Sequence, residues 1–117
     1  MTEEMIGELK QTCHRIEEIL YLLMYKERES ILNTAVEVFG TSSRRVEIYL
    51  MLDGKISATE IAAKLDMKRP NVSIEIGILY NSGLIEQVEA KQGSPYQRRL
   101  AFELIGLPAI IKERFNL

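Results

Sequence analysis

Four polar side chains around a short turn are the residues of this sequence best suited to recognise a nucleic acid. Lys68, Arg69, Asn71 and Ser73 follow a turn that begins at Asp66. An arginine can pair with guanine through two donors, an asparagine can read adenine, and lysine and serine suit phosphate oxygens. The alternative interpretation is that Lys68 and Arg69 are ordinary solvated residues beside a turn.

Two predicted helices place these side chains. The first begins with a capping box, in which the Ser57 hydroxyl caps the first turn and Glu60 reaches back. The second has Pro70 in its first turn, where the missing N–H costs nothing, and it ends at Gly83. This spacing is typical of a helix-turn-helix, which presents the start of its second helix to the DNA major groove. Ser57 and Thr59 are therefore further candidate contacts.

A β-hairpin is expected after this motif. Residues 84–88 and 97–104 have β character, and residues 92–95, which read Gln-Gly-Ser-Pro, are typical of a turn. Such a wing lies along the phosphate backbone or reaches the minor groove. The candidate contacts near its tip are Lys91, Gln92 and Ser94. The alternative is a solvated hairpin whose charges keep its edge soluble.

Four arginines outside the turn are also considered. Arg98 shares strand parity with Leu100, so it is expected over the apolar side of the hairpin, which leaves Arg99 freer to reach DNA. Arg44 and Arg45 begin a predicted helix over residues 44–52 and could grip phosphate. Both oppose the dipole of that helix, a small cost that an anionic partner would relieve.

Part of the second helix does not fit a polar DNA-reading surface. Glu75 would repel phosphate if it faced DNA. Ile78 is expected to pack against another helix of this chain or of a second subunit. For Ile74 two interpretations stay open, namely packing and contact with a thymine methyl group.

The N-terminal segment carries an apolar seam with steps of three and four residues. Its members are Ile6, Leu9, Cys13, Ile16, Leu20 and Leu23. A heptad seam is typical of a coiled coil, so a dimer interface is predicted. The alternative is that this helix lies on its own winged helix. A break is expected near residues 25–29, followed by a second amphipathic helix that ends at Gly40.

Composition and charge limit the class of protein. The chain has 117 residues, enough for one domain, and no apolar run approaches the roughly 18 residues of a membrane helix. The acidic start and the single cysteine favour a reducing cytoplasm. Residues 1–40 hold four Lys/Arg against eight Asp/Glu, whereas residues 41–117 hold eleven against nine. The basic excess therefore lies with the helix-turn-helix, as a phosphate-facing end requires.

Catalytic chemistry finds no support in the sequence. Cys13 and His14 are adjacent on a predicted helix and point about 100° apart, which is poor geometry for a shared metal ion. No Gly-rich phosphate loop is present, so no enzyme activity, metal or cofactor is predicted. Cys13 is expected to be a buried thiol of the seam, and the alternative is a redox or metal sensor between subunits.

Residues 44–104 resemble the winged-helix transcription regulators of bacteria and archaea, the broad MarR/ArsR/TrmB-like group. The resemblance rests on the capping-box helix from Ser57 to Ala62, the turn from Met67 to Ser73, and the exit from Asn81 to Ile85. It implies a homodimer on a palindrome-like DNA site, with flanking helices at the dimer interface. Gly77 and the two neighbouring isoleucines depart from the usual polar outer face.

These observations predict a mainly α fold with a small β-hairpin. A helical dimerisation segment is expected over residues 1–40, and a winged helix-turn-helix domain with a short C-terminal helix over residues 41–117. The predicted function is that of a DNA-binding transcription regulator acting as a homodimer on double-stranded DNA. The alternative is a winged-helix module that binds protein within a larger assembly.

Overall fold

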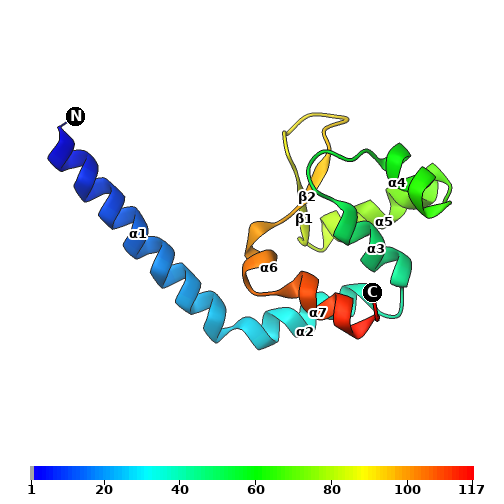
Figure 1. The fold of residues 1–117 in the computed structure, drawn as a ribbon, viewed down its shortest axis with the longest axis horizontal. Helices are drawn as coiled ribbons and strands as arrows, with labels where there is room; N and C mark the ends of the chain where they lie inside the picture. The colour runs from blue at the N-terminus through cyan, green and yellow to red at the C-terminus, as the bar shows by residue number, and fades with distance from the viewer. Residues whose placement is uncertain (1) are drawn as a thin grey trace. The chain divides into compact units, whose positions relative to one another are not determined.

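The structure is a computed structural model that describes residues 2–117. It contains two compact units, the first ending at Ile31 and the second beginning at Leu32. In chain order the described elements are α1 (Glu3–Lys26), α2 (Arg28–Phe39), α3 (Ser43–Met51), α4 (Ala58–Leu65), α5 (Arg69–Asn81), β1 (Ile85–Gln87), β2 (Tyr96–Arg98), α6 (Leu100–Leu104) and α7 (Leu107–Arg114) (Figure 1). The predicted fold class, mainly α with a small β-hairpin, is confirmed.

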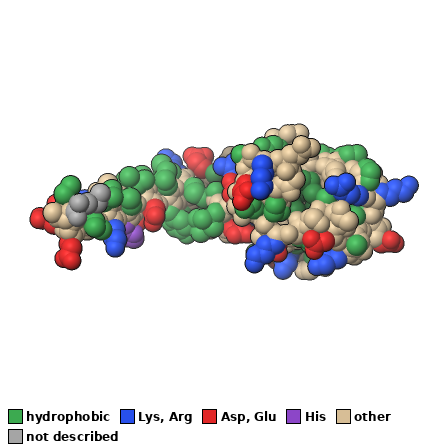
Figure 2. Space-filling view, turned by 90° about the horizontal axis from the view of Figure 1, so that it is seen from above, with side chains coloured by type: hydrophobic (Ala, Val, Ile, Leu, Met, Phe, Trp, Pro, Cys, Tyr) green, Lys and Arg blue, Asp and Glu red, His purple; other side chains and the backbone are tan. Residues whose placement is uncertain are grey.

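The first unit is built on one long helix. Thr2 caps α1, since its hydroxyl oxygen accepts a hydrogen bond from the backbone N–H of Met5 at 3.2 Å. Acidic residues in the first turn and Lys26 in the last turn complement the helix dipole. The expected break is confirmed, because α1 ends at Lys26 and α2 begins at Arg28. Figure 2 shows hydrophobic side chains gathered on this helix, none of which is buried.

The second unit has a core made by helices that bury one apolar stripe each. Its buried members include Leu32, Ala35 and Phe39 of α2, Val46, Ile48 and Tyr49 of α3, Val72, Ile76 and Leu79 of α5, and Leu107 and Ile111 of α7. The boundary between the two compact units falls inside α2, because the buried residues of this helix all belong to the second unit.

The helix ends follow local chemistry. The Ser42 hydroxyl accepts from the N–H of Arg45 at the start of α3. Gly40 and Gly83 have positive φ angles of 54° and 78°, where glycine is favoured, and they follow α2 and α5. Among residues 2–117, no helix combines the length and the apolar composition needed to cross a membrane.

The hairpin is shorter than the sequence predicts. β1 pairs antiparallel with β2, and Ile85 lies opposite Arg98 at the end of the ladder. Asp53 adds an isolated bridge to Gln97. The prediction of a strand over residues 97–104 was wrong, because β2 ends at Arg98 and Leu100–Leu104 forms α6. Ile85 is the first residue of β1, and the chain before it comes from the end of α5. No strand therefore lies opposite the residues that follow Arg98.

Candidate nucleic-acid interface

The helix-turn-helix forms as predicted from its capping signals. The backbone N–H of Glu60 donates to the Ser57 hydroxyl at 3.1 Å, and the Glu60 carboxylate accepts from the N–H of Ser57 at 3.3 Å. The capping box is therefore confirmed. Asp66, with a φ of 52°, ends α4, and Lys68 occupies the N-cap position of α5. Helix α5 starts at Arg69, three residues after this left-handed residue.

The start of α5 presents its polar side chains to solvent. Lys68, Arg69, Asn71 and Ser73 are all exposed, and within the described part of the chain no hydrogen bond or ion pair engages their side chains. Val72 lies between them in sequence but is fully buried on the opposite side of the helix. Burial of that stripe fixes the rotation of α5, so the polar residues face outward together.

A groove of about 450 Å³ runs between the start of α4, one side of α5 and the hairpin. Among the predicted site residues, Ser57, Thr59, Arg69, Ser73 and Ser94 line it. The structure thus brings together residues from all three parts of the motif. Gln87, Tyr96 and Lys55 also line the groove and were not predicted. Lys55 had one usable sequence signal, a basic residue in the turn just before the capping box.

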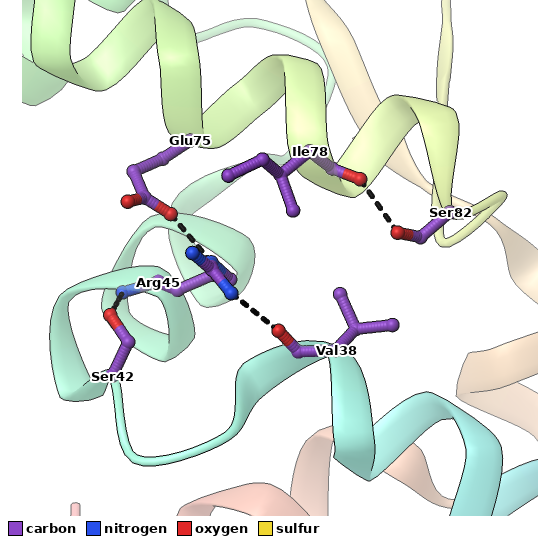
Figure 3. Close-up of polar contacts among 6 residues, drawn as sticks. All are labelled: Val38, Ser42, Arg45, Glu75, Ile78 and Ser82. Atoms are coloured by element: carbon purple, nitrogen blue, oxygen red, sulfur yellow. Dashed lines mark hydrogen bonds and ion pairs between the residues drawn. The ribbon is translucent and has the colours of Figure 1, made fainter.

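Arg45 was predicted to contact phosphate, but its side chain bonds within the protein. Its Nε donates to Oε2 of Glu75 on α5 at 2.6 Å, and its Nη1 donates to the carbonyl oxygen of Val38 on α2 at 2.6 Å (Figure 3). The side chains of Arg45 and Glu75 are both only 21% exposed. The structure therefore removes Arg45 from the set of residues free to reach phosphate. It also explains Glu75, whose charge is paired on the side of α5 that faces α3.

Ile78 lies on this same side of α5. It is half-buried, and in Figure 3 its side chain points from α5 toward Arg45 and Val38. The expectation that Ile78 packs within a protein is confirmed. Ile74 differs, since 60% of its surface is exposed. It stands on the outer side of α5.

The hairpin tip keeps two of its three predicted contacts exposed. Lys91 and Gln92 face solvent, and the ammonium of Lys91 lies 3.1 Å from the carboxylate of Glu89, with both side chains well exposed. Ser94 is only 6% exposed, and its hydroxyl accepts from the N–H of Glu89 at 2.9 Å. The structure contradicts the contact expected of Ser94, because its hydroxyl shapes the turn and has almost no free surface.

The remaining arginines divide into held and exposed side chains. Arg98 donates to the carbonyl oxygen of Leu50 at 2.6 Å and to Glu103 at 2.8 Å, so it fastens the hairpin to α3 and α6. Arg99 is exposed, with one longer bond of 3.4 Å to the carbonyl oxygen of Gly83. Arg99 is therefore the freer of the two, although the strand parity that suggested this was wrong. Arg44 is 53% exposed and pairs with Glu47 at 3.2 Å.

The apolar seam lies along α1. Its large members are between 39% exposed at Ile6 and 56% exposed at Leu23, and Cys13 is also exposed. Cys13 is thus not buried within one chain, and its burial in the seam stays a prediction that depends on the dimer. Within residues 2–117, no group of three or more His, Cys, Asp or Glu side chains could hold a metal ion.

Two solved structures are similar to this chain. One is the crystal structure of a MarR family transcription regulator, with 20% sequence identity and a TM-score of 0.49, and the match covers 97% of this chain and 77% of that one. The other is the multiple antibiotic-resistance repressor (MarR) from Listeria monocytogenes, with 16% identity and a TM-score of 0.50 over 100% of this chain and 84% of that one. A search of the sequence against protein-family models and curated proteins finds no match.

The likeness concerns the fold. The order of helices, the helix-turn-helix and the two-stranded wing are those of a winged helix, as the second of these structures has. The chain has a winged-helix fold, and the predicted fold of the broad MarR/ArsR/TrmB-like group is confirmed.

Proposed function

We propose that this protein is a DNA-binding transcription regulator that acts as a homodimer. Helix α5 lies in the major groove, and the hairpin lies on the phosphate backbone beside it. One observation carries the proposal, namely the exposed and unpaired cluster of Lys68, Arg69, Asn71 and Ser73 among the described residues at the start of α5. The multiple antibiotic-resistance repressor named above has a similar fold, and its name describes a repressor.

The electrostatics of α5 support this assignment. The only acidic residue of the helix, Glu75, is neutralised by Arg45 on the inner side. The surface that α5 offers to solvent therefore begins with two cations and has no carboxylate of its own to repel phosphate. Arg99, which is exposed directly after β2, adds positive charge beside the hairpin, whereas Lys91 is paired with Glu89.

The first experiment measures binding to mixed-sequence duplex DNA across salt concentrations. We expect affinity to fall steeply with salt, because each Lys or Arg that contacts a phosphate adds about 0.9 to the slope of log K against log salt. Replacing Lys68→Ala and Arg69→Ala together weakens binding and flattens this slope. The matched control replaces Lys112→Ala and Arg114→Ala, two exposed basic residues of α7, and removes the same charge elsewhere.

A second function class is favoured by one observation. Ile74 is 60% exposed on the outer side of α5, as expected for a helix that packs against another protein. A winged helix used in this way serves as a protein-interaction module. Absence of DNA binding by the intact chain at low salt would support this class and contradict the proposal above.

The dimer is proposed to form through α1. No residue of α1 is buried, so the described part of the first unit leaves the seam from Ile6 to Leu23 uncovered. A second copy of the same helix supplies the complementary seam. Leu20→Glu should give monomers in sedimentation, because it places a charge in the interface. Gln11→Glu, on the opposite side of the heptad, is the matched control and should leave the dimer intact.

A further inference from the structure

Gly77 lies in the interior of α5, where no contact within this chain requires a glycine. Its φ is not positive, and a Cβ added there would meet nothing within 4 Å. Neither backbone conformation nor packing therefore requires glycine. A glycine in a helix interior is less stable than an alanine, because it loses more backbone freedom on folding. The position favours a partner that approaches the helix more closely than a Cβ would allow.

The surroundings of Gly77 indicate the kind of partner. One helical row holds Arg69, Ser73 and Gly77, and all three line the groove between α5 and the hairpin. This row offers a cation and a hydroxyl, which are donors for phosphate oxygens. Gly77 continues this row and has no side chain to keep a strand away from the helix backbone. The row therefore fits a sugar-phosphate strand that passes between the helix and the hairpin.

Ile74 adds a second feature beside this row. It lies three residues before Gly77, and so on the same exposed side of α5, and 60% of its surface is open. Ile78 and Glu75 are committed to contacts within the chain, whereas Ile74 is not. In the major groove only thymine presents a methyl group to an apolar side chain.

We infer that Gly77 and Ile74 form a close-approach point for duplex DNA on α5. Gly77 admits the sugar-phosphate strand to the helix backbone, and Ile74 contacts the C5-methyl group of a thymine. Each half-site of the bound DNA therefore contains a thymine opposite the middle of α5. This inference rests on the proposed function, since it specifies how the same helix meets DNA.

The test of Gly77 combines stability with binding. Gly77→Ala should raise Tm by roughly 4 °C, because alanine is the better helix former. The same variant should weaken DNA binding by about tenfold, because the added methyl group overpacks the contact. Gly7→Ala is the matched control, since a Cβ at Gly7 of α1 also meets nothing within 4 Å. It should stabilise α1 and leave DNA affinity unchanged.

The test of Ile74 uses a duplex recovered with the wild-type protein from random-sequence DNA. Each thymine of the half-site is replaced in turn by deoxyuridine, which lacks only the methyl group. At one position the wild-type protein should lose about fourfold in affinity, the effect of leaving one methyl group unburied. The Ile74→Ala variant should bind both duplexes equally.

The outcomes separate this inference from the proposed function. A wild-type protein that binds no DNA at low salt overturns both. Binding by Gly77→Ala at wild-type strength, or a half-site without a methyl-sensitive thymine, overturns this inference and leaves the regulator assignment intact. A change in sedimentation mass with Ile74→Ala, without a change in DNA affinity, assigns this face to a second protein chain and also overturns the inference.

Discussion

The guanidinium of Arg45 bonds to two other helices at once. It joins α3 to Glu75 on α5 and to the carbonyl end of α2 at Val38. The side chains of Arg45 and Glu75 are only about one-fifth exposed. Removing the guanidinium would therefore leave the Glu75 carboxylate partly buried without a partner. Arg45 thus joins α3 to α5 and α2, so its effect on DNA would be indirect.

Arg45→Ala is expected to lower the free energy of unfolding by about 2 kcal/mol in urea denaturation, the usual scale for a lost charge-assisted hydrogen bond. Arg44→Ala is the matched control, because the Arg44 side chain is 53% exposed where it pairs with Glu47. That variant should lower stability by about 0.5 kcal/mol or less. Equal losses in the two variants would contradict the structural role of Arg45.

Tyr49 carries a hydroxyl that the fold does not satisfy. The residue is fully buried, its ring packs edge-on against Phe39 at 5.3 Å, and its hydroxyl has no hydrogen-bond partner among the described residues. Burial raises the pKa of Tyr49 above its ordinary value, since the charged form would lose its hydration. The hydroxyl therefore stays protonated and costs stability.

Tyr49→Phe should stabilise the protein by about 1 kcal/mol, because it removes an unsatisfied buried group and keeps the ring. Thermal unfolding of the two proteins at one pH measures the difference. A clear loss of stability would mean that the hydroxyl has a partner in solution, such as a buried water molecule.

Ser57, at the start of α4, is both a helix cap and a candidate DNA contact. The Ser57 oxygen accepts from the N–H of Glu60, and the residue also lines the groove. Ser57→Ala should lower stability by about 1 kcal/mol through loss of the cap. Ser57→Asp keeps the cap and should keep stability, because aspartate is as good an N-cap as serine.

The two Ser57 variants should rank in the opposite order for DNA affinity. Ser57→Asp places a negative charge on the surface that we propose for phosphate, so it should weaken binding more than Ser57→Ala does. Fluorescence anisotropy with one labelled duplex at fixed salt measures both affinities. Equal affinities for the serine and aspartate forms would exclude the start of α4 from the interface.

Local signals explain which elements could be predicted. The capping box at Ser57, the proline in the first turn of α5 and the glycine at position 83 act within a few residues, and these boundaries were predicted correctly. The break after Lys26 and the end of α2 at Gly40 were also visible in the sequence. Each signal satisfies backbone groups next to it in the chain, so no tertiary information is needed.

Tertiary contacts explain what could not be predicted. Alternating apolar residues at 100, 102 and 104 read as a strand, but strand length depends on the partner, which starts only at Ile85. The bond from Arg98 to Glu103 then holds the first turns of α6. Likewise, Arg45 and Glu75 lie 30 residues apart, so their ion pair could not be predicted from the sequence. Arg45 was therefore expected near phosphate, and Glu75 was expected to repel phosphate if it faced DNA. The burial of Ser94 depends on how the turn closes over Glu89.

The whole molecule places its acidic excess in the first 40 residues and its basic excess in the rest. In the proposed dimer the acidic helices meet each other and the winged helices meet DNA. The pairing direction of α1 then decides where the two winged helices lie. They follow the C-terminal ends of the two helices, and only parallel pairing brings these ends together.

The residues that flank the seam favour parallel pairing. Residues 19–25 are all apolar, and parallel pairing sets each copy of this run against the other, with Ile19 beside Met24 of the partner subunit. Antiparallel pairing would instead set the run against the acidic start of the partner's helix. The antiparallel pair would gain only exposed ion pairs between Lys10 of one copy and Glu17 of the other, each worth about 0–1 kcal/mol. The seam itself is buried in either direction, so the difference lies in Ile19 and Met24, whose mutual burial outweighs those pairs at about 1.5–3 kcal/mol for each fully buried side chain.

Cysteine cross-linking tests the direction of pairing. Ile6→Cys is made in a Cys13→Ser background, so that position 6 carries the only thiol. In a parallel, in-register pair the two thiols share one layer and should form a disulfide under mild oxidation. In an antiparallel pair position 6 lies opposite Leu23, and the two thiols would be about 25 Å apart. Denaturing electrophoresis without reductant reads the result as a dimer or monomer band. Mixing this variant with Leu23→Cys in the same background is the complementary control, since a mixed disulfide forms only if the helices run in opposite directions.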